Sequence, residues 1–428
     1  MRITIYPPER LRVHAQLPAS KSISNRALVI QALAARNCAG QVPEVRNLSD
    51  CDDTQVMLRA LSTMPDVIDI MAAGTAMRFL TAYLSITPGT HTITGTERMR
   101  HRPIGILVDA LHRLGAAVEY AAEKGFPPLR ITGRSLQGGA LELAGSVSSQ
   151  YISALLMIAP MMEQGLTLTL TGNIVSRPYI DMTLAIMGTF GAKVRWQDGR
   201  TLRVEPVKYA PTPYTVENDW SASSYWYEMM ALTHDSEPSV TLSGLFSQSL
   251  QGDAAIREIF RPLGIATEFV RDGDGTEGIR LTRCGKPCKH YEYDFVRQPD
   301  LAQTVVVTRA LLGVTFRFTG LQSLKIKETD RLAALCTELG KLGYRLREQD
   351  GCVLSWEGER CAAQERPVAD TYEDHRMAIS LAPACMVTGR LEMNDPQVVS
   401  KSYPRFWQEL KGFHIEEEQE GGAQGRYT

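Results

Sequence analysis

The chain has 428 residues and little that would bind a metal or form disulfides. Its eight cysteines are scattered without a CxxC pair, and only Cys284 and Cys288 are close together. No histidine pair lies nearby to complete a zinc site. The sequence therefore predicts free thiols, no bound metal and no cofactor.

Long apolar runs and an excess of charge of one sign are also lacking. The longest apolar run, Ala154 to Met162, is interrupted by Pro160 and is too short to span a bilayer. No apolar signal segment precedes Pro7 and Pro8. A net charge of -2 gives no general attraction to nucleic acid or to an anionic membrane. We therefore expect a cytoplasmic protein whose partners are neither membranes nor nucleic acids.

The common motifs of covalent and nucleotide chemistry are absent. The sequence has no GxSxG, no HExxH and no P-loop. Gly273 to Gly278 fits the glycine spacing of a dinucleotide-binding loop, but it lies between two strand-like runs and opens no helix. We interpret it as a hairpin turn.

What the sequence does contain is a repeated alternation of helix and strand. From Gly115 to Gly412, a helical pattern that ends in glycine and leads into a short strand recurs about every seventy residues. Short strands that close on Thr-Gly or Ser-Gly recur as well. Together with an earlier, less regular copy, the pattern predicts an α/β protein built by repetition, with three units in each of two domains. The proline-rich segment Lys208 to Tyr214 is the expected linker.

The stretch from Pro18 to Ala34 predicts a helix whose N-terminus can bind an anion. Apolar residues recur at the spacing of one helix face, and a run of serines stands where N-caps belong. Lys21 and Arg26 add two cations to the unpaired N–H groups of the helix start. The same pattern is also that of an ordinary capped helix with two solvated cations.

Similar loops of small and cationic residues stand before other apolar helices. Lys327 and Arg331 are four residues apart, which predicts that both lie on one face of a helix start. Few carboxylates accompany these cations, chiefly Asp300 and Glu328. Many cations on both halves of the chain, with these few carboxylates, indicate metal-free group transfer between two anionic substrates with proton transfer.

These segments, in this order, resemble the EPSP synthase (3-phosphoshikimate 1-carboxyvinyltransferase) family. The matching segments are Leu17-Pro-Ala-Ser-Lys-Ser-Ile-Ser-Asn-Arg26, Ala73-Gly-Thr-Ala-Met-Arg78, Arg102-Pro-Ile, Gly145-Ser-Val-Ser-Ser-Gln150, Ser176-Arg-Pro-Tyr179, Pro299-Asp300, Lys327-Glu-Thr-Asp-Arg331, Asp374-His-Arg376 and Lys401. The resemblance runs from about residue 17 to residue 407.

The resemblance implies a reaction of the shikimate pathway towards chorismate and the aromatic amino acids. Phosphoenolpyruvate and shikimate 3-phosphate give 5-enolpyruvylshikimate 3-phosphate and phosphate through a tetrahedral intermediate. It also implies two similar domains, each of three βαβαββ units, that close over a cleft between them. We expect one domain at residues 18–218 and the other at residues 1–17 and 219–428. We further expect a monomer that uses only small-molecule substrates.

The resemblance also implies roles for individual residues. The residues that resemble the shikimate 3-phosphate site are Lys21, Ser22, Arg26, Ser148, Ser149, Gln150, Ser176, Asp300, Ser323 and Lys327. Those that resemble the phosphoenolpyruvate site are Lys21, Gly74, Thr75, Arg102, Gln150, Arg331, Arg376 and Lys401. Those that match the acid and base residues are Lys21, Asp300 and Glu328.

The sequence departs from the family pattern in four places. Ala72 and Ser323 each stand where the family usually has Asn, Phe79 replaces a Pro, and the run from Val296 to Gln298 also differs. These departures bear on substrate affinity and on the response to glyphosate, which occupies the phosphoenolpyruvate site in this family.

Two rival interpretations remain. The sister enzyme UDP-N-acetylglucosamine enolpyruvyl transferase usually has a reactive Cys before its counterpart of Arg102, and the segment from Gly95 to His101 has none. A non-catalytic anion-binding protein is the other rival, suggested by Ala72 and Ser323. The retained Lys21, Asp300 and Glu328 argue against it.

Overall fold

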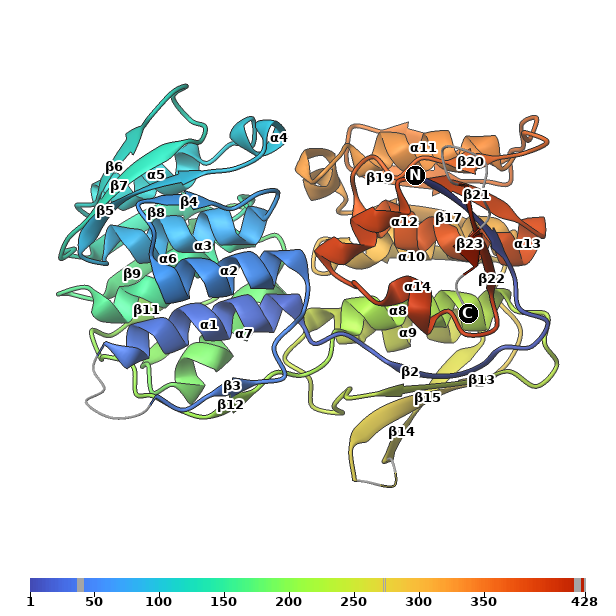
Figure 1. Ribbon diagram of the computed structural model, residues 1–428, viewed down its shortest axis with the longest axis horizontal. Coiled ribbons are helices and arrows are strands. Elements are labelled where there is room, and N and C mark those ends of the chain that lie inside the picture. Colours follow the sequence, from blue (N-terminus) through green and yellow to red (C-terminus); the bar gives the residue numbers. More distant parts are fainter. Residues whose placement is uncertain (37–41, 272, 274, 419–424, 427–428) are drawn as a thin grey trace. The chain divides into compact units, whose positions relative to one another are not determined.

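The computed structural model describes residues 1–36, 42–271, 273, 275–418 and 425–426. The chain divides into two compact units (Figure 1). Unit 1 consists of Met1–Pro18 and Asn218–Thr428, and unit 2 is Ala19–Glu217. Each unit has its own core of buried apolar side chains. Among the described residues, no helix combines the length and the apolar character needed to cross a bilayer.

Unit 2 alternates helices and short strands. Its strands are β3 (Val45–Arg46), β4 (Val67–Asp69), β5 (Gly89–Thr94), β6 (Ala117–Tyr120), β7 (Leu129–Gly133), β8 (Gly139–Ala144), β9 (Leu166–Thr171), β10 (Val194–Trp196), β11 (Thr201–Val204) and β12 (Tyr214–Thr215). Its helices are α1 (Lys21–Ala35), α2 (Asp52–Thr63), α3 (Gly74–Ser85), α4 (Glu97–Arg100), α5 (Gly105–Arg113), α6 (Ser149–Ile158), the 3-10 helix η1 (Ala159–Met161) and α7 (Arg177–Thr189).

Unit 1 combines the start of the chain with its second half. Its strands are β1 (Arg2–Tyr6), β2 (Arg12–Gln16), β13 (Ser239–Ser243), β14 (Ile265–Arg271), β15 (Glu277–Arg283), β16 (His290–Asp294), β17 (Thr315–Thr319), β18 (Arg347–Gln349), β19 (Val353–Trp356), β20 (Val368–Ala369), β21 (Leu391–Asn394), β22 (His414–Glu418) and β23 (Gly425–Arg426). Its α-helices are α8 (Trp220–Leu232), α9 (Ile256–Phe260), α10 (Ala302–Leu312), α11 (Arg331–Lys341), α12 (His375–Leu381), α13 (Cys385–Thr388) and α14 (Phe406–Glu409). Its 3-10 helices are η2 (Gly252–Ala255), η3 (Arg261–Leu263), η4 (Pro299–Leu301), η5 (Gln322–Ile326), η6 (Ala382–Ala384) and η7 (Pro396–Lys401).

Five of the sheets that the described residues form repeat one topology, and the sixth is the parallel pair of β3 and β12. In unit 2 the strand orders are β4-β5-β7-β6 and β8-β9-β11-β10, and in each the first pair is parallel and the other two pairs are antiparallel. In unit 1 the sheets β2-β13-β15-β14 and β16-β17-β19-β18 follow the same rule. So does β20-β21-β1-β22, in which β1 from the start of the chain takes the third place. The α/β class and the repeated units predicted from the sequence are confirmed.

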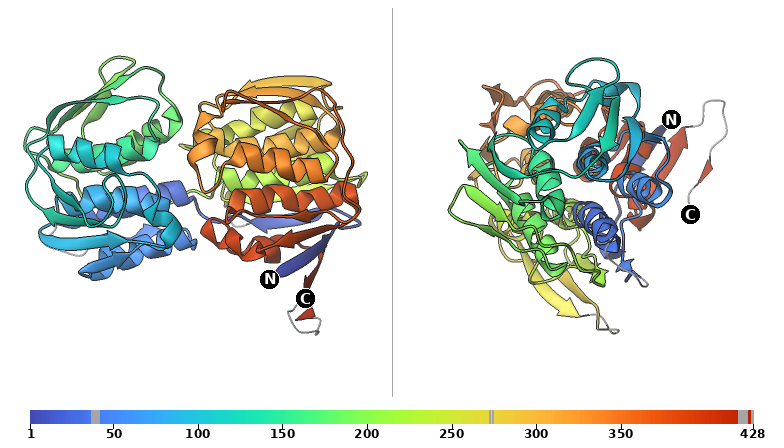
Figure 2. Two further views of the ribbon diagram at one scale, coloured as in Figure 1. Left: turned by 90° about the horizontal axis from the view of Figure 1, so that it is seen from above. Right: turned by 90° about the vertical axis from the view of Figure 1, so that its left-hand side faces the viewer.

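Helices fill the interior of each unit, and sheets lie on the outside (Figures 1 and 2). This arrangement explains why several helices are apolar on nearly all sides: all twelve residues of α3 are buried. In α1 the predicted apolar face is buried, with Ile23, Ala27, Ile30 and Ala34 each at most 1% exposed. The helix-to-glycine-to-strand pattern is confirmed too, for example where α5 leads through Gly115 into β6.

The predicted hairpin around Gly273 is confirmed in its strands. β14 and β15 pair antiparallel, with Arg271 opposite Glu277. Residues 272 and 274 of the turn lie outside the described residues. The predicted linker is wrong, because Lys208 to Tyr214 belongs to unit 2. Tyr209 is 2% exposed, and its hydroxyl donates to the carbonyl of Met157 at 2.8 Å.

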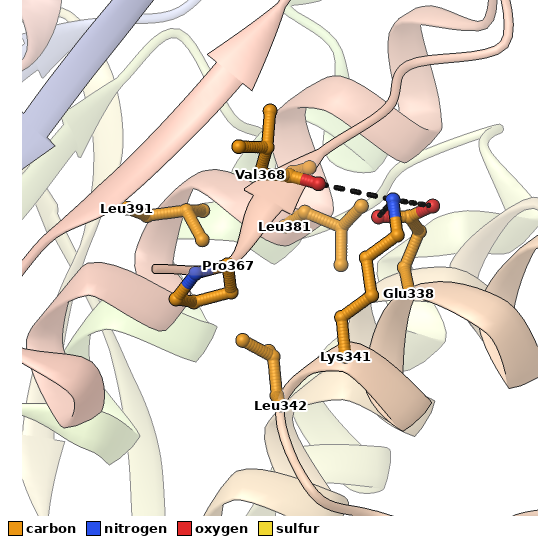
Figure 3. Close-up of a pocket in the computed structure, with 8 residues that line it drawn as sticks. Glu338, Lys341, Leu342, Pro367, Val368, Leu381 and Leu391 are labelled. Carbon is orange, nitrogen blue, oxygen red and sulfur yellow. Dashed lines mark hydrogen bonds and ion pairs between the residues drawn. The ribbon is translucent and has the colours of Figure 1, made fainter. Parts of the chain in front are cut away.

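A small cavity lies in unit 1 between α11, β20 and β21 (Figure 3). Its volume of about 10 Å³ is close to the space of one water molecule. Lys341 at its edge donates to both carboxylate oxygens of Glu338, at 2.8 and 2.9 Å, and to the carbonyl of Val368 at 3.0 Å. The cavity is too small for an organic substrate, so we assign these side chains a structural role.

Candidate active-site clusters

Arg26 ties the start of α1 to two other helices of unit 2. Its guanidinium donates to the Ser22 carbonyl at 2.8 Å, to Thr183 Oγ1 on α7 at 2.7 Å and to Ser153 Oγ on α6 at 3.1 Å. It also lies 5.3 Å from the centre of the Phe79 ring on α3. Burial lowers the pKa of Arg26 to about 10, which still leaves it charged at neutral pH.

The N-termini of α3 and α6 meet through side chains. Gln150 Nε2 donates to Thr75 Oγ1 at 3.2 Å, which places the first turns of the two helices together. Gly74 begins α3 with the guanidinium of Arg102 directly over it, since a β-carbon at residue 74 would lie 2.5 Å from Arg102 Nη1. Only glycine fits under this arginine without displacing it. Two helix N-termini and one guanidinium therefore converge, which suits an anion.

Serines occupy the helix starts as the sequence predicts. Ser20 caps α1 by accepting from the Ile23 N–H at 3.4 Å, and Ser148 caps α6 by accepting from the Gln150 N–H at 3.4 Å. Ser149 is the first residue of α6. Ser176 precedes α7 in a left-handed backbone conformation with φ of 56°, which a non-glycine residue rarely adopts. Such strain is found most often at functional sites.

Lys21 is the first residue of α1, and its side chain is partly exposed. Its Nζ lies 3.9 Å from Asp53 Oδ2 on α2. We call this group of unit 2 residues the helix-end cluster. Its members are Lys21, Ser22, Arg26, Gly74, Thr75, Arg102, Ser148, Ser149, Gln150 and Ser176.

In unit 1, Asp300 on η4 is surrounded by cations. Its Oδ1 lies 3.3 Å from Lys327 Nζ and 3.3 Å from Arg331 Nη1. Its Oδ2 accepts from Arg376 Nη2 at 3.1 Å. Burial alone would raise the pKa of this carboxyl, but Arg376, Lys327 and Arg331 hold it far below its usual range. Asp300 is therefore ionised throughout the physiological pH range.

Arg331 joins Asp300 to two further carboxylates. It donates to Asp374 from Nε at 2.7 Å and from Nη2 at 3.1 Å, and Nη2 also reaches Glu328 Oε2 at 2.8 Å. Its side chain is 1% exposed. Burial disfavours its charge, but Asp374, Glu328 and Asp300 together raise the pKa of Arg331 above its usual value.

The predicted helix start at Lys327 is wrong, although both cations reach Asp300. Helix α11 begins at Arg331, and Lys327 is the C-cap residue that follows η5. Asp330 caps α11 by accepting from the N–H groups of Leu332 and Ala333, at 3.2 and 3.1 Å. Lys327 and Arg331 therefore approach Asp300 from a turn and from a helix, not from one helix face.

Two further predicted site residues, Ser323 and Lys401, also belong to unit 1. Lys401 at the end of η7 donates to the carbonyl of Glu373 at 2.8 Å, directly before the Asp374–Arg376 segment. The Ser323 hydroxyl on η5 is buried and has no hydrogen-bond partner among the residues that the structure describes. We call the unit 1 group the Asp300 cluster. Its members are Asp300, Ser323, Lys327, Glu328, Arg331, Arg376 and Lys401.

Sequence reasoning missed the partners that hold these side chains. Asp374 caps α12 through the N–H of Arg376 at 2.9 Å and holds Arg331 at the same time. It was visible as a carboxylate beside a predicted arginine, but its partner lies 43 residues away. Thr183 and Ser153, which hold Arg26, carry no sequence signal of that role. Within the described ranges, no group of three or more His, Cys, Asp or Glu side chains is arranged to hold a metal ion.

The chain shares its fold with an EPSP synthase of known structure. The structure matches the EPSP synthase from Acinetobacter baumannii with a TM-score of 0.76 at 20% identity, over 97% of this chain and 100% of that one. At this identity the match establishes the fold.

The sequence places it in a family. The model of the family "EPSP synthase (3-phosphoshikimate 1-carboxyvinyltransferase)" matches residues 5–68 and 61–410. A 3-phosphoshikimate 1-carboxyvinyltransferase of Bacteroides fragilis is 56% identical over 97% of this chain and 99% of its own length. One of Aliivibrio fischeri is 34% identical over 96% of this chain and 98% of its own length. The chain belongs to the EPSP synthase family, as the sequence motifs predict.

Proposed function

We propose that this protein transfers the enolpyruvyl group of phosphoenolpyruvate to the 5-hydroxyl of shikimate 3-phosphate, releasing phosphate. The observation that carries the proposal is membership of the EPSP synthase family over nearly the whole chain. The two clusters support it, because they supply cations, helix N-termini and carboxylates of the kinds that two anionic substrates and a proton transfer need. The reaction belongs to the shikimate pathway towards chorismate and the aromatic amino acids.

The ligands that we propose for shikimate 3-phosphate are mainly serines and cations. The proposed ligands are Lys21, Ser22, Arg26, Ser148, Ser149, Gln150, Ser176, Asp300, Ser323 and Lys327. The helix starts at Ser149 and Arg177 favour the phosphate through their unpaired N–H groups. Arg26 contributes a fixed positive charge, since four hydrogen bonds hold its guanidinium.

The ligands that we propose for phosphoenolpyruvate are mainly arginines and lysines. The proposed ligands are Lys21, Gly74, Thr75, Arg102, Gln150, Arg331, Arg376 and Lys401. Arg102 and the first turn of α3 already lie together around Gly74. Arg331 and Arg376 are both fixed against Asp300, so their charges are preorganised for an anion.

Lys21, Asp300 and Glu328 are the proposed acid and base residues. The 5-hydroxyl must lose a proton as it attacks C2 of phosphoenolpyruvate, while C3 gains one. The tetrahedral intermediate then expels phosphate with loss of a proton from C3. Acid and base therefore exchange roles between the two halves of the reaction, which a lysine and two carboxylates set among arginines can do.

The organisation of the protein is part of the proposal. We assign the enolpyruvyl transferase domains to residues 18–218 and to residues 1–17 with 219–428, and the division of the chain into two units supports this. We further propose a cytoplasmic monomer that works without metal or cofactor. Light scattering of the purified protein at micromolar concentration tests the monomer, and a dimer mass would contradict it.

The first experiment measures phosphate release from phosphoenolpyruvate with each of two acceptors. We expect release with shikimate 3-phosphate and none with UDP-N-acetylglucosamine. Asp300→Asn and Lys21→Ala should abolish it, and the exposed Asp198→Asn should not. Release only with the nucleotide sugar would assign the chain to the sister reaction. If folded protein releases no phosphate with either acceptor, the alternative of a non-catalytic anion-binding protein would be favoured.

A further inference from the structure

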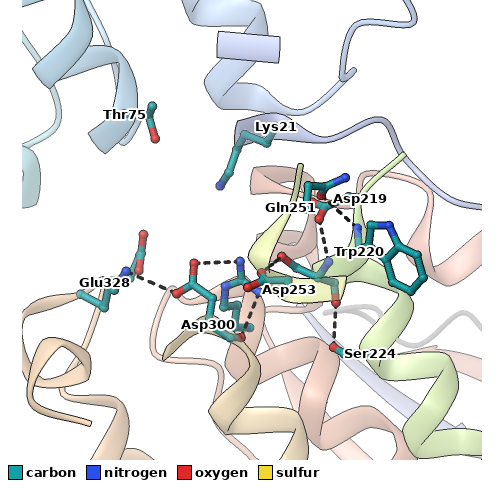
Figure 4. Close-up of polar contacts among 12 residues, drawn as sticks. Lys21, Thr75, Asp219, Trp220, Ser224, Gln251, Asp253, Asp300 and Glu328 are labelled. Carbon is teal, nitrogen blue, oxygen red and sulfur yellow. Dashed lines mark hydrogen bonds and ion pairs between the residues drawn. The ribbon is translucent and has the colours of Figure 1, made fainter. Parts of the chain in front are cut away.

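Asp253 is a carboxyl group of unit 1 that is buried beside Asp300, and the mechanism above gives it no role. It lies on η2 and is 3% exposed. The hydroxyl of Ser221, in the first turn of α8, donates to its Oδ2. Figure 4 shows Asp253 and Asp300 in the same group of polar side chains. Burial of a carboxyl group costs free energy unless a partner compensates it, so its presence here needs an explanation.

The backbone around Asp253 is held in place by Gln251. Its Oε1 accepts from the Trp220 N–H at 3.1 Å, and its Nε2 donates to the Asn218 carbonyl at 2.8 Å. Asp219 caps α8 by accepting from the Ser221 N–H at 2.8 Å. The Asp253 carboxyl is therefore fixed against the start of α8, and it cannot turn towards solvent without breaking this frame.

The charged groups that shift the pKa of Asp253 are Asp300 on η4, Arg376 on α12 and Asp219 at the cap of α8. On β16, burial raises the pKa of Tyr293, and the charge of Asp253 adds to this. Arg257 on the neighbouring α9 instead faces the rings of Trp220 and Phe269, at 5.3 Å from each. Burial, followed by the charge of Asp300, raises the pKa of Asp253 to about 6, and Arg376 opposes this.

We propose that Asp253 is a positioning residue that shares the positive charge of Arg376 with Asp300 and so sets the basicity of Asp300. The proposal rests on the proposed function, in which Asp300 acts as a base. Three cations leave Asp300 a weak base. An ionised Asp253 counteracts Arg376, and because the interaction of two charges is mutual, it raises the pKa of Asp300. A neutral Asp253 leaves Asp300 less basic.

The first test compares Asp253→Asn with wild type from pH 5 to pH 9. Asparagine keeps the shape and the oxygen that accepts from Ser221, but it is always neutral. The ratio of variant to wild-type kcat/KM should be near one at pH 5 and fall, with a midpoint near 6, to on the order of one tenth above pH 7. The substrate phosphates titrate equally in both proteins, so they cancel in this ratio. A ratio that does not change with pH would overturn the proposal.

Ser221→Ala provides a second variant with a different expected profile. The Ser221 hydroxyl stabilises the ionised Asp253 carboxylate, so removal of this hydroxyl should raise the pKa of Asp253. Activity should match wild type at pH 5 and pH 9 and fall below it around pH 7. The absence of this dip would also count against the proposal. Asp235→Asn is the control and should give a flat ratio near one, because this carboxylate of the same unit accepts from the backbone N–H of Glu237 in a loop.

Urea unfolding tests the same coupling without turnover. The free energy of unfolding of Asp253→Asn relative to wild type should increase with pH from about 4 to about 6. Over this range the unfolded wild-type chain has lost the Asp253 proton, whereas the folded protein still keeps it because its pKa is raised. When Asp300 is also replaced by Asn, this increase should end at a lower pH, because the negative charge that raises the pKa of Asp253 is gone. If the increase ends at the same pH, the coupling is refuted, even for a protein that shows no turnover. Turnover with a flat pH ratio would refute it while the proposed function stands.

Discussion

At the scale of single residues, Arg331 holds the Asp300 cluster together. It is the shared partner of Asp300, Glu328 and Asp374, and its two contacts to Asp374 use separate nitrogens. A lysine has the same charge but a single ammonium group, which cannot reach all three carboxylates. At a buried site, a carboxylate left without its partner is strongly destabilising.

Arg331→Lys should therefore lower the free energy of unfolding by about 3 kcal/mol at pH 7.5. Urea denaturation followed by circular dichroism measures it. The exposed Arg345→Lys serves as the control and should change stability by less than about 0.5 kcal/mol. A loss as small as that of the control would show that Lys327 and Arg376 compensate the three carboxylates by themselves.

Glu228 on α8 is a second residue whose charge should affect stability. It is fully buried, and burial raises its pKa well above the usual 4.5, although the side chain of Thr308 opposes this. The folded protein then keeps a proton that the unfolded chain loses above about pH 4.5. Stability from this group is complete below that pH and decreases as pH rises towards the folded-state pKa.

Glu228→Gln removes this titration and keeps the shape. The variant should match wild type near pH 4 and gain relative stability at about 1.4 kcal/mol per pH unit above pH 5. Thermal or urea unfolding between pH 4 and pH 8 measures the difference. The exposed Glu258→Gln should show no such slope. A flat difference for Glu228→Gln would mean that Glu228 is ionised in the folded protein.

At the scale of elements, the start of α3 depends on a residue without a side chain. A β-carbon at residue 74 would lie 2.5 Å from Arg102 Nη1 and 2.6 Å from Arg78 Nη1. Gly74→Ala should push Arg102 away while α3 stays helical, because alanine favours helix. We expect the KM for phosphoenolpyruvate to rise on the order of tenfold, the KM for shikimate 3-phosphate to change little, and Tm to stay within a few degrees.

The matched control is Gly188→Ala on α7, where a β-carbon would meet no atom within 4 Å. It should leave both KM values unchanged. Equal effects of Gly74→Ala on the two substrates would contradict the placement of Arg102 at the phosphoenolpyruvate site. Initial-rate kinetics with each substrate varied in turn distinguishes these outcomes.

The elements also show how far the sequence predicts this protein. Local patterns were sufficient for α1, for the strands that end in Thr-Gly and for the capping serines, because these depend on neighbouring residues. Local spacing failed at Lys327 and Arg331, where a cap at Asp330 starts the helix later. It also failed at Lys208 to Tyr214, where Tyr209 is buried by residues distant in sequence. The partners of Arg26 and Arg331 depend on tertiary packing and carry no local signal.

At the scale of the whole molecule, unit 2 interrupts the sequence of unit 1 between Pro18 and Asn218. Within unit 2, the Ser20 N–H donates to the Glu217 carbonyl at 2.8 Å, so the two ends of the unit lie together. Within unit 1, the Asp219 N–H donates to the Pro18 carbonyl at 2.8 Å, which closes the gap that the insertion leaves. A unit with a core of its own and adjacent ends has the properties of an independently folding domain.

A fragment of residues 19–217 should therefore fold by itself and unfold in one cooperative thermal transition. A fragment of equal length, residues 119–317, takes part of each unit and should not. The folded fragment should release no phosphate from phosphoenolpyruvate, because Asp300, Glu328 and the cations around them belong to unit 1. A broad, non-cooperative transition for residues 19–217 would show that the inserted unit needs unit 1 to fold. Turnover by the fragment would show that the Asp300 cluster is dispensable, and would overturn its assigned role in the reaction.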